Sequence, residues 1–202
     1  MSVGVGYTAC KAPTSVTSSV TIQKPGAPIV ISWKNADGGT SNAITGYTLY
    51  YRRGAAPTTE TYDGKTEISS TVTEDSHTYS SFASNSYRGS TYYFKVVTKG
   101  AAGSSYYSTI SSAQATCKVN SLPTLSSVSA NKNIIARNSA TSVTFTLSGA
   151  ANDGTLSFRY ATSNSTSSTT GITNGASLSV AAGTSNVTYY FWAYDGLEYS
   201  TS

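Results

Sequence analysis

The sequence predicts an all-β protein built from two tandem β-sandwiches. Short apolar runs alternate with polar residues along the chain, as they do in strands that bury one face. Only 11% of the residues are charged, and Ser, Thr, Gly and Tyr are abundant, so strands and turns are favoured over helices. A chain of 202 residues is long for one sandwich of about 100 residues and suits two.

The first module is expected over residues 12–118, after an N-terminal extension of residues 1–11. In an early strand of this module Ile29, Ile31 and Trp33 point inward, while the residues between them point outward, and the two strongest strands come last. Further strands of this module are expected at residues 44–52, 67–73, 77–82, 91–99 and 106–116.

The second module is expected over residues 119–202 and looks like a shorter immunoglobulin-like sandwich. Its first strong alternation buries Val143, Phe145 and Leu147. A second one buries the apolar residues Leu156, Phe158 and Tyr160. The dominant strand is expected at residues 187–194, with inward residues Val187, Tyr189, Phe191 and Ala193.

The opposite phase of that strand predicts a binding surface. Tyr190, Trp192 and Tyr194 would line its outward face, and Arg159 would face outward from a neighbouring strand. Tyr, Trp and Arg are enriched at binding hot spots and also stack on sugar rings. Three interpretations stay open: a loop or module covers the stripe, a protein binds it, or a glycan stacks on it.

Several segments of the first module resemble the fibronectin type III signature. The residues are 29–33 (IVISW), 44–52 (ITGYTLYYR) and 92–96 (YYFKV), which correspond to an inward Trp followed by two Tyr-rich strands. The chain departs from the pattern before the sixth strand, where it has Ser86 to Gly89 in place of a Leu and a Pro-Gly. The sequence contains no Arg-Gly-Asp, so integrin adhesion does not carry over. The resemblance covers about half of the chain and implies fold rather than function.

The two cysteines are expected to mark the organisation of the chain. Cys10 and Cys117 are each followed by Lys and, a few residues later, by Pro-Thr, so they are predicted to precede the first strand of successive modules. Positions one module apart are too distant for a disulfide, whose Cα atoms lie within about 7 Å. We expect small apolar plugs at module junctions, with an intramodule bridge or a link between subunits as alternatives.

The sequence offers little material for catalysis. His77 is the single histidine, and no nucleophile motif, phosphate loop or His/Cys ligand set accompanies it. Four acidic residues stand in Asp-Gly turns and lack the clustered oxygens of a calcium site. We therefore expect no enzyme, no catalytic residue, no cofactor and no metal.

Charge and hydropathy argue against nucleic-acid and membrane partners. The formal charge of +4 is carried by residues 1–118, where basic side chains are scattered rather than clustered. No apolar run approaches the ~20 residues of a membrane span. Residues 1–10 lack the basic and apolar regions of a secretory signal, so we expect synthesis in the cytoplasm of a host cell.

Three sequence segments resemble fibronectin type III modules of minor structural proteins in tailed phages of Gram-positive hosts. They are residues 41–47 (SNAITGY), 88–96 (RGSTYYFKV) and 98–108 (TKGAAGSSYYS). The resemblance implies a virion surface protein of the tail, a fibre or the capsid decoration. Its partners would be other virion proteins, further copies of itself and host-surface glycans. The alternative is a bacterial cell-surface adhesin or a carbohydrate-associated accessory module.

Overall fold

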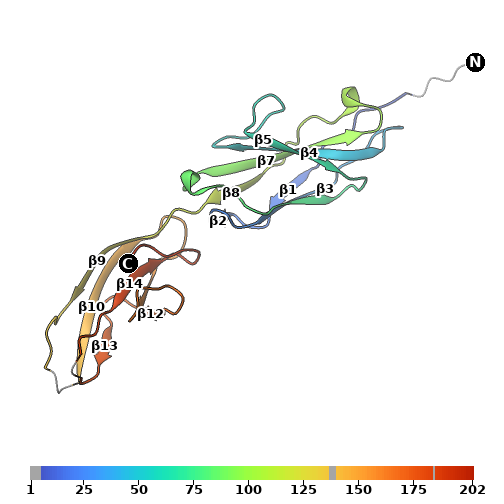
Figure 1. The fold of residues 1–202 in the computed structure, drawn as a ribbon. Helices are drawn as coiled ribbons and strands as arrows, with labels where there is room; N and C mark the ends of the chain where they lie inside the picture. Colours follow the sequence, from blue (N-terminus) through green and yellow to red (C-terminus); the bar gives the residue numbers. More distant parts are fainter. Residues whose placement is uncertain (1–5, 137–139, 184) are drawn as a thin grey trace, which may run out of the picture. The chain divides into compact units, whose positions relative to one another are not determined.

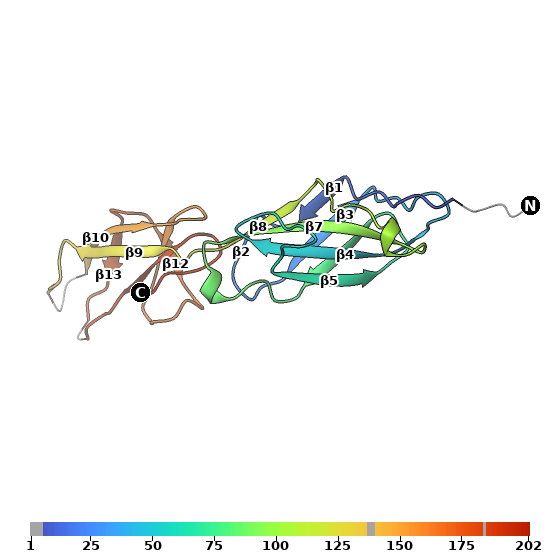
Figure 2. The same ribbon diagram turned by 90° about the horizontal axis from the view of Figure 1, so that it is seen from above.

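The structure is a computed structural model that describes residues 6–136, 140–183 and 185–202. Its chain divides into two compact units, Met1–Asn120 and Ser121–Ser202. The predicted all-β class is confirmed, because the regular elements are strands together with two short 3₁₀ turns, η1 (Asn85–Tyr87) and η2 (Ser104–Tyr106). Figures 1 and 2 show the strands of each unit stacked in layers.

The first unit is a β-sandwich of two sheets. One sheet has the order β1-β3-β6 and the other β2-β8-β7-β4-β5, with antiparallel pairing except between β2 and β8. The strands are β1 (Ser15–Ser18), β2 (Ile22–Gln23), β3 (Ile29–Lys34), β4 (Ile44–Arg53), β5 (Gly64–Ser69), β6 (Asp75–Tyr79), β7 (Thr91–Gly100) and β8 (Ala115–Val119).

The core of the first unit follows the predicted alternation. Ile29, Ile31 and Trp33 of β3 are all at most 1% exposed, and Tyr47 and Leu49 of β4 are fully buried opposite them. The rings of Trp33 and Tyr47 meet edge to face with centroids 5.0 Å apart. This burial confirms the prediction that Trp33 is a core residue. A fully buried side chain of this size stabilises the fold by roughly 3 kcal/mol.

The predicted strand at residues 106–116 is wrong over most of its length, because β8 begins only at Ala115. Two serine hydroxyls explain the difference. Ser108 Oγ accepts a hydrogen bond from the Thr98 N–H at 2.8 Å, and Ser111 Oγ accepts one from the Val96 N–H at 3.1 Å. These hydroxyls take the places of backbone carbonyls beside β7, so the segment runs along the sheet without a regular ladder.

Residues 8–11, expected to be part of an extension, are bonded to one end of the first sandwich. Thr8 N–H donates to Thr40 O at 3.2 Å, and Cys10 N–H donates to Tyr106 O at 2.9 Å. The buried Asn42 side chain joins the pieces, donating to Thr8 O at 3.0 Å and to Tyr106 O at 3.1 Å. A side chain at Gly100 would collide with Asn42, so glycine there makes room for this junction.

Both cysteines are free and buried, but they do not occupy equivalent places. Cys117 lies inside β8 and is fully buried in the core of the first unit, rather than plugging a junction ahead of the second. Cys10 lies beside Asn42, whose Nδ2 is 3.3 Å from its sulfur. The prediction that each cysteine precedes the first strand of a module is wrong for Cys117, because β8 continues to Val119 and places Cys117 in the last strand of the first sandwich.

The second unit is a smaller sandwich with two three-stranded sheets, β13-β10-β9 and β12-β11-β14. Val143, Phe145 and Leu147 of β10 form its core together with Phe191 of β14, as the alternation predicted. The strands are β9 (Thr124–Ala130), β10 (Thr141–Ala150), β11 (Ser157–Ala161), β12 (Thr170–Ile172), β13 (Ser177–Val180) and β14 (Tyr190–Tyr194).

The strand predicted at residues 187–194 begins later than expected. Val187 is 52% exposed and lies outside β14, which pairs with β11 only from Tyr190 onward. Tyr189 still packs against the core. Val187 therefore does not face inward, because the chain before Tyr190 has no strand beside it to continue the ladder.

Candidate binding surfaces

The predicted aromatic stripe, made of Tyr190, Trp192 and Tyr194 with Arg159 beside it, lies on the expected face of the sheet, but its central side chain is not exposed. Arg159 and Trp192 are directly opposite each other in the β11–β14 pairing, on the face away from Phe191. Trp192 is only 3% exposed, and Tyr190 and Tyr194 are half-buried. The prediction that Trp192 is a surface or interface residue is therefore wrong.

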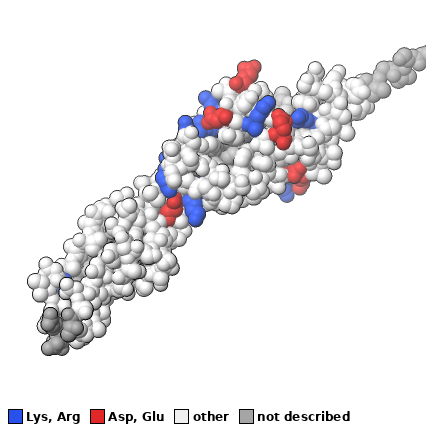
Figure 3. All heavy atoms as spheres, viewed as in Figure 1, with Lys and Arg blue, Asp and Glu red and all other residues white. Residues whose placement is uncertain are grey.

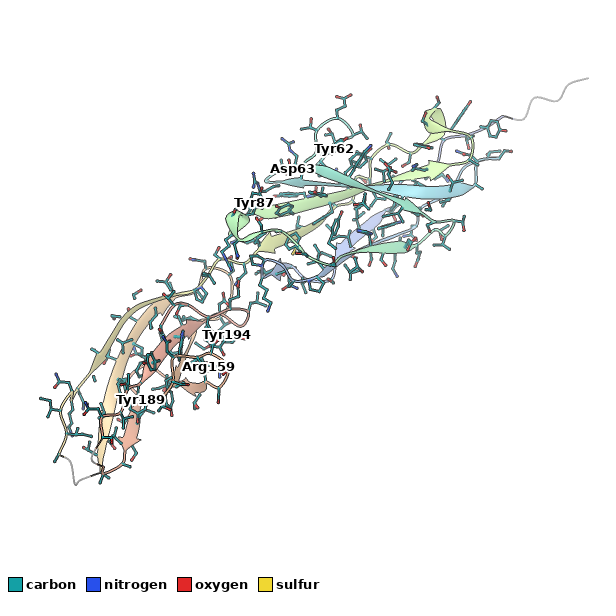
Figure 4. The ribbon with its side chains drawn as sticks, in the orientation of Figure 1. Tyr62, Asp63, Tyr87, Arg159, Tyr189 and Tyr194 are labelled. Atoms are coloured by element: carbon teal, nitrogen blue, oxygen red, sulfur yellow. The ribbon has the colours of Figure 1, made fainter. Side chains whose placement is uncertain are left out.

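The neighbours of Trp192 explain this burial. The Tyr190 ring stacks beside the indole with centroids 6.4 Å apart. The Arg159 guanidinium carbon lies 5.3 Å from the centre of the Tyr194 ring (Figure 4), and Tyr194 in turn packs on Tyr199 at 4.5 Å. The side chains of the stripe thus cover one another. Only the outer parts of the Tyr190 and Tyr194 rings are accessible to a partner.

Arg159 is held over its own sheet. Gly171 is its partner in β12, and a Cβ there would lie in ordinary van der Waals contact with Arg159 Nη1, at 3.7 Å, so the guanidinium lies above this position of the strand. Arg159 Nε is buried and has no hydrogen-bond partner among residues 6–136, 140–183 and 185–202. A guanidinium in this position contributes packing and a cation–π contact, and little of it is available to a ligand.

A second surface, which the sequence did not indicate, lies in the first unit. We call it the aromatic cleft, and its volume is about 310 Å³. It is lined by Tyr51, Tyr79, Phe82, Tyr87, Tyr92 and Phe94, together with Ser81, Ala83 and Ser84. Tyr87 is the most exposed aromatic residue of the cleft, with 37% of its surface exposed, while Tyr51 and Tyr79 are half-buried. The other five rings form a wall and floor that continue into the core.

Arg53 and Asp63 add charge at the rim of this cleft. The Arg53 guanidinium carbon lies 4.2 Å from the centre of the Tyr87 ring, a close cation–π contact. Asp63 Oδ2 accepts a hydrogen bond from the Arg53 backbone N–H at 2.7 Å. Figure 4 shows Tyr62, Asp63 and Tyr87 on the same unit, and Figure 3 shows the charged side chains gathered on that unit.

Two tyrosine hydroxyls of the cleft have raised pKa values. Burial raises the pKa of Tyr79 to about 12, and burial also raises that of Tyr92. Ala83 in the wall has a left-handed φ of 54°, which is strained for a residue with a Cβ. The cleft therefore offers aromatic faces and hydroxyl groups, with one cation and one carboxylate beside it, a combination suited to an apolar or sugar-like ring.

No metal site is formed by His, Cys, Asp and Glu within the part of the chain that the structure describes. The ring of His77 packs edge to face on Tyr79 at 4.7 Å, which gives this histidine a structural contact. Within the same residues, no helix has the length and apolar character needed to cross a membrane.

Sequence comparison finds no matching family model and no match among curated proteins. Structural comparison finds the FN1–FN3 domains of chicken CNTN1, with 14% identity and a TM-score of 0.35, over 94% of this chain and 62% of that one. It also finds the fibronectin(III)-like modules of Clostridium thermocellum CbhA, with 16% identity and a TM-score of 0.37, over 93% of this chain and 89% of that one.

Proposed function

We propose that this chain is a non-enzymatic structural protein of a tailed-phage virion. It would dock on the protein lattice of the particle and present its sandwiches to the host surface, where they contact glycans weakly. The phage setting rests on the resemblance of residues 41–47, 88–96 and 98–108 to modules of such proteins. The mode of action rests on the binding surfaces of the two units.

The aromatic cleft is the observation that carries the adhesive part of this proposal. Its most exposed ring, Tyr87, is held by the Arg53 guanidinium 4.2 Å from its centre, so little side-chain entropy is lost when a ligand stacks on the ring. The cleft volume of about 310 Å³ lies at the lower end of the range for small-molecule sites. One such contact is weak, and many copies on one particle would add to a firm attachment.

Binding to host-cell-wall polysaccharide tests this part directly. Tyr87→Ala should weaken binding of the full chain by about tenfold or more, since base- and ring-stacking aromatics and hot-spot residues contribute at least ~1.4 kcal/mol. Tyr62→Ala is the matched control, because Tyr62 is also 37% exposed and lies outside the cleft lining. Equal losses in both variants, or no binding by the parent chain, would contradict a glycan site here.

Docking on the particle requires a further surface, and the neutral second unit is the stronger candidate. The charged residues of 119–202 are three basic and three acidic ones, so this unit has no net charge. Figure 3 shows the visible face of the second unit almost without charged side chains. Low charge is typical of the centres of protein interfaces. The half-buried rims of Tyr190 and Tyr194 would contribute to it, while the buried Trp192 would support them from beneath.

A further inference from the structure

Basic side chains gather on the outer face of the five-stranded sheet of the first unit, where β4, β5 and β7 lie close together (Figure 2). Leu49 of β4 and Val96 of β7 are opposite partners and fully buried, so the alternate residues of these strands point away from the core. The same alternation holds in β5, where Ile68 packs against the core. We call the outward cations of these three strands the basic face; they are Arg52, Lys65, Lys95 and Lys99.

Only part of this positive charge is balanced by the protein itself. Lys99 Nζ lies 2.9 Å from Glu67 Oε2, and Lys65 Nζ lies 3.7 Å from Glu67 Oε1. Glu67 is the one acidic residue on the outer face of the strands that the structure describes in this sheet. The side chains of Arg52 and Lys95 have no ion pair or hydrogen bond to any residue of the described part of the chain. Two cations of the basic face therefore remain without a partner.

The protection of a sheet edge does not explain where these two cations lie. β4 and β7 are interior strands in the order β2-β8-β7-β4-β5, whereas Lys65 lies on the edge strand β5 and helps to shield it. Arg52 is paired with Tyr93 and Lys95 with Tyr50, so the two cations are diagonal neighbours with Cα atoms about 7 to 8 Å apart. Like charges at this separation repel each other and do not stabilise the sheet. Such a pair is complementary to a negatively charged partner.

The β5 side of the basic face is filled by the protein's own side chains. Tyr62 packs edge-on against Tyr50 with ring centroids 5.0 Å apart, and Lys65 Nζ lies 6.0 Å from the centre of the Tyr62 ring. Glu60 and Asp63 lie in the loop before β5 and offset part of the positive charge there. The unbalanced positive charge therefore lies over the β4–β7 pair.

The chemistry of this pair favours an acidic sugar polymer. The guanidinium of Arg52 can donate two parallel hydrogen bonds to one carboxylate, and Lys95 supplies a second cation. Tyr93, opposite Arg52 and two residues before Lys95, is half-buried and offers a ring face on which a sugar can stack. DNA carries one charge per about 1.7 Å and is bound through many phosphate contacts, whereas a polymer with one acidic group per sugar carries its charges farther apart. Two unpaired cations suit the sparser polymer.

We propose that Arg52, Tyr93 and Lys95 bind an acidic polysaccharide of the host surface through its carboxylates. This inference rests on the proposed function for the source of the polymer. It adds a charged class of glycan and a surface outside the lining of the aromatic cleft.

Titration calorimetry of the full chain with polygalacturonate tests this binding, and the fully methyl-esterified polymer is the uncharged match. The parent chain should bind polygalacturonate and not the ester. Raising the ionic strength from about 0.1 to about 1 M should weaken the binding by at least about tenfold, because the screening length falls from about 10 to about 3 Å.

Two double variants separate this site from the net charge of the chain. Arg52→Gln/Lys95→Gln should weaken binding by at least about tenfold, because it removes two charge-assisted contacts. Lys24→Gln/Lys34→Gln is the control, since it removes the same charge from positions outside the basic face, and it should bind within about twofold of the parent. Circular dichroism should show both double variants folded.

The Tyr87→Ala chain should keep the salt-sensitive binding of polygalacturonate, so this site and the aromatic cleft can fail separately. Three results would overturn the proposal: a parent chain that binds neither polymer or both equally, equal losses in the two double variants, or tighter binding of duplex DNA than of polygalacturonate.

Discussion

Replacement of Trp192 with alanine tests the packing of the second unit. The indole is 3% exposed, and a buried Trp removes about 150 to 250 Å² of surface from water. At ~25 cal/mol per Å², and allowing for partial relaxation of the cavity, the loss is about 3 to 5 kcal/mol. A unit of this size has a free energy of unfolding of only about 4 to 12 kcal/mol, so Trp192→Ala should remove much of it.

Urea unfolding of the full chain measures this effect. With a slope of about 1 to 2 kcal/mol per M, the transition of the second unit, followed by circular dichroism, should move by about 2 M or more. Trp33 is the other tryptophan of the chain, and its fluorescence should report an unchanged transition of the first unit. Trp192→Phe, which keeps a ring beside Tyr190, should cost less than half as much. A loss below about 1 kcal/mol for Trp192→Ala would refute the packing described for this face.

Further predictions concern the first unit. Ala83→Gly should raise the free energy of unfolding by about 1 kcal/mol in urea titrations, because it relieves a left-handed backbone; destabilisation would contradict the strain. The pKa of Tyr79 is raised to about 12, so its stabilising contribution is complete below pH ~10 and is lost as the pH rises towards 12. Tyr79→Phe should flatten this alkaline loss, and an unchanged pH profile would count against it. Cys10 and Cys117 should resist thiol reagents until the protein unfolds, and rapid labelling of native protein would disprove their burial.

Period-two patterns predicted many of the residues that face the two cores, although Val187 is an exception. Ile31 and Trp33 in one unit, and Val143 and Phe145 in the other, are buried as their alternation indicates. The same pattern assigned Trp192 to the opposite face correctly but could not say whether that face is covered. Coverage depends on side chains from β11, β14 and the C-terminal segment, whose meeting is a tertiary event.

Features made from distant residues were not predictable from one sequence. The aromatic cleft combines rings of β4, β6 and β7 with Phe82 and Tyr87 from the intervening loop, and no local spacing links them. Ser108 and Ser111 look like residues of a strand, and only their bonds to β7 show that hydroxyls replace the ladder. The anchoring of residues 8–11 likewise depends on Asn42, which stands in a loop with turn-like composition.

Quantitative mass spectrometry of purified phage particles from the host that carries this sequence tests the central claim most directly. The account predicts that the chain co-purifies with intact particles at many copies per particle and remains after the particles are washed free of host envelope. Its recovery only in the host envelope, or as a free subunit beside a hydrolase, would contradict a virion role and favour the adhesin or carbohydrate-associated alternative.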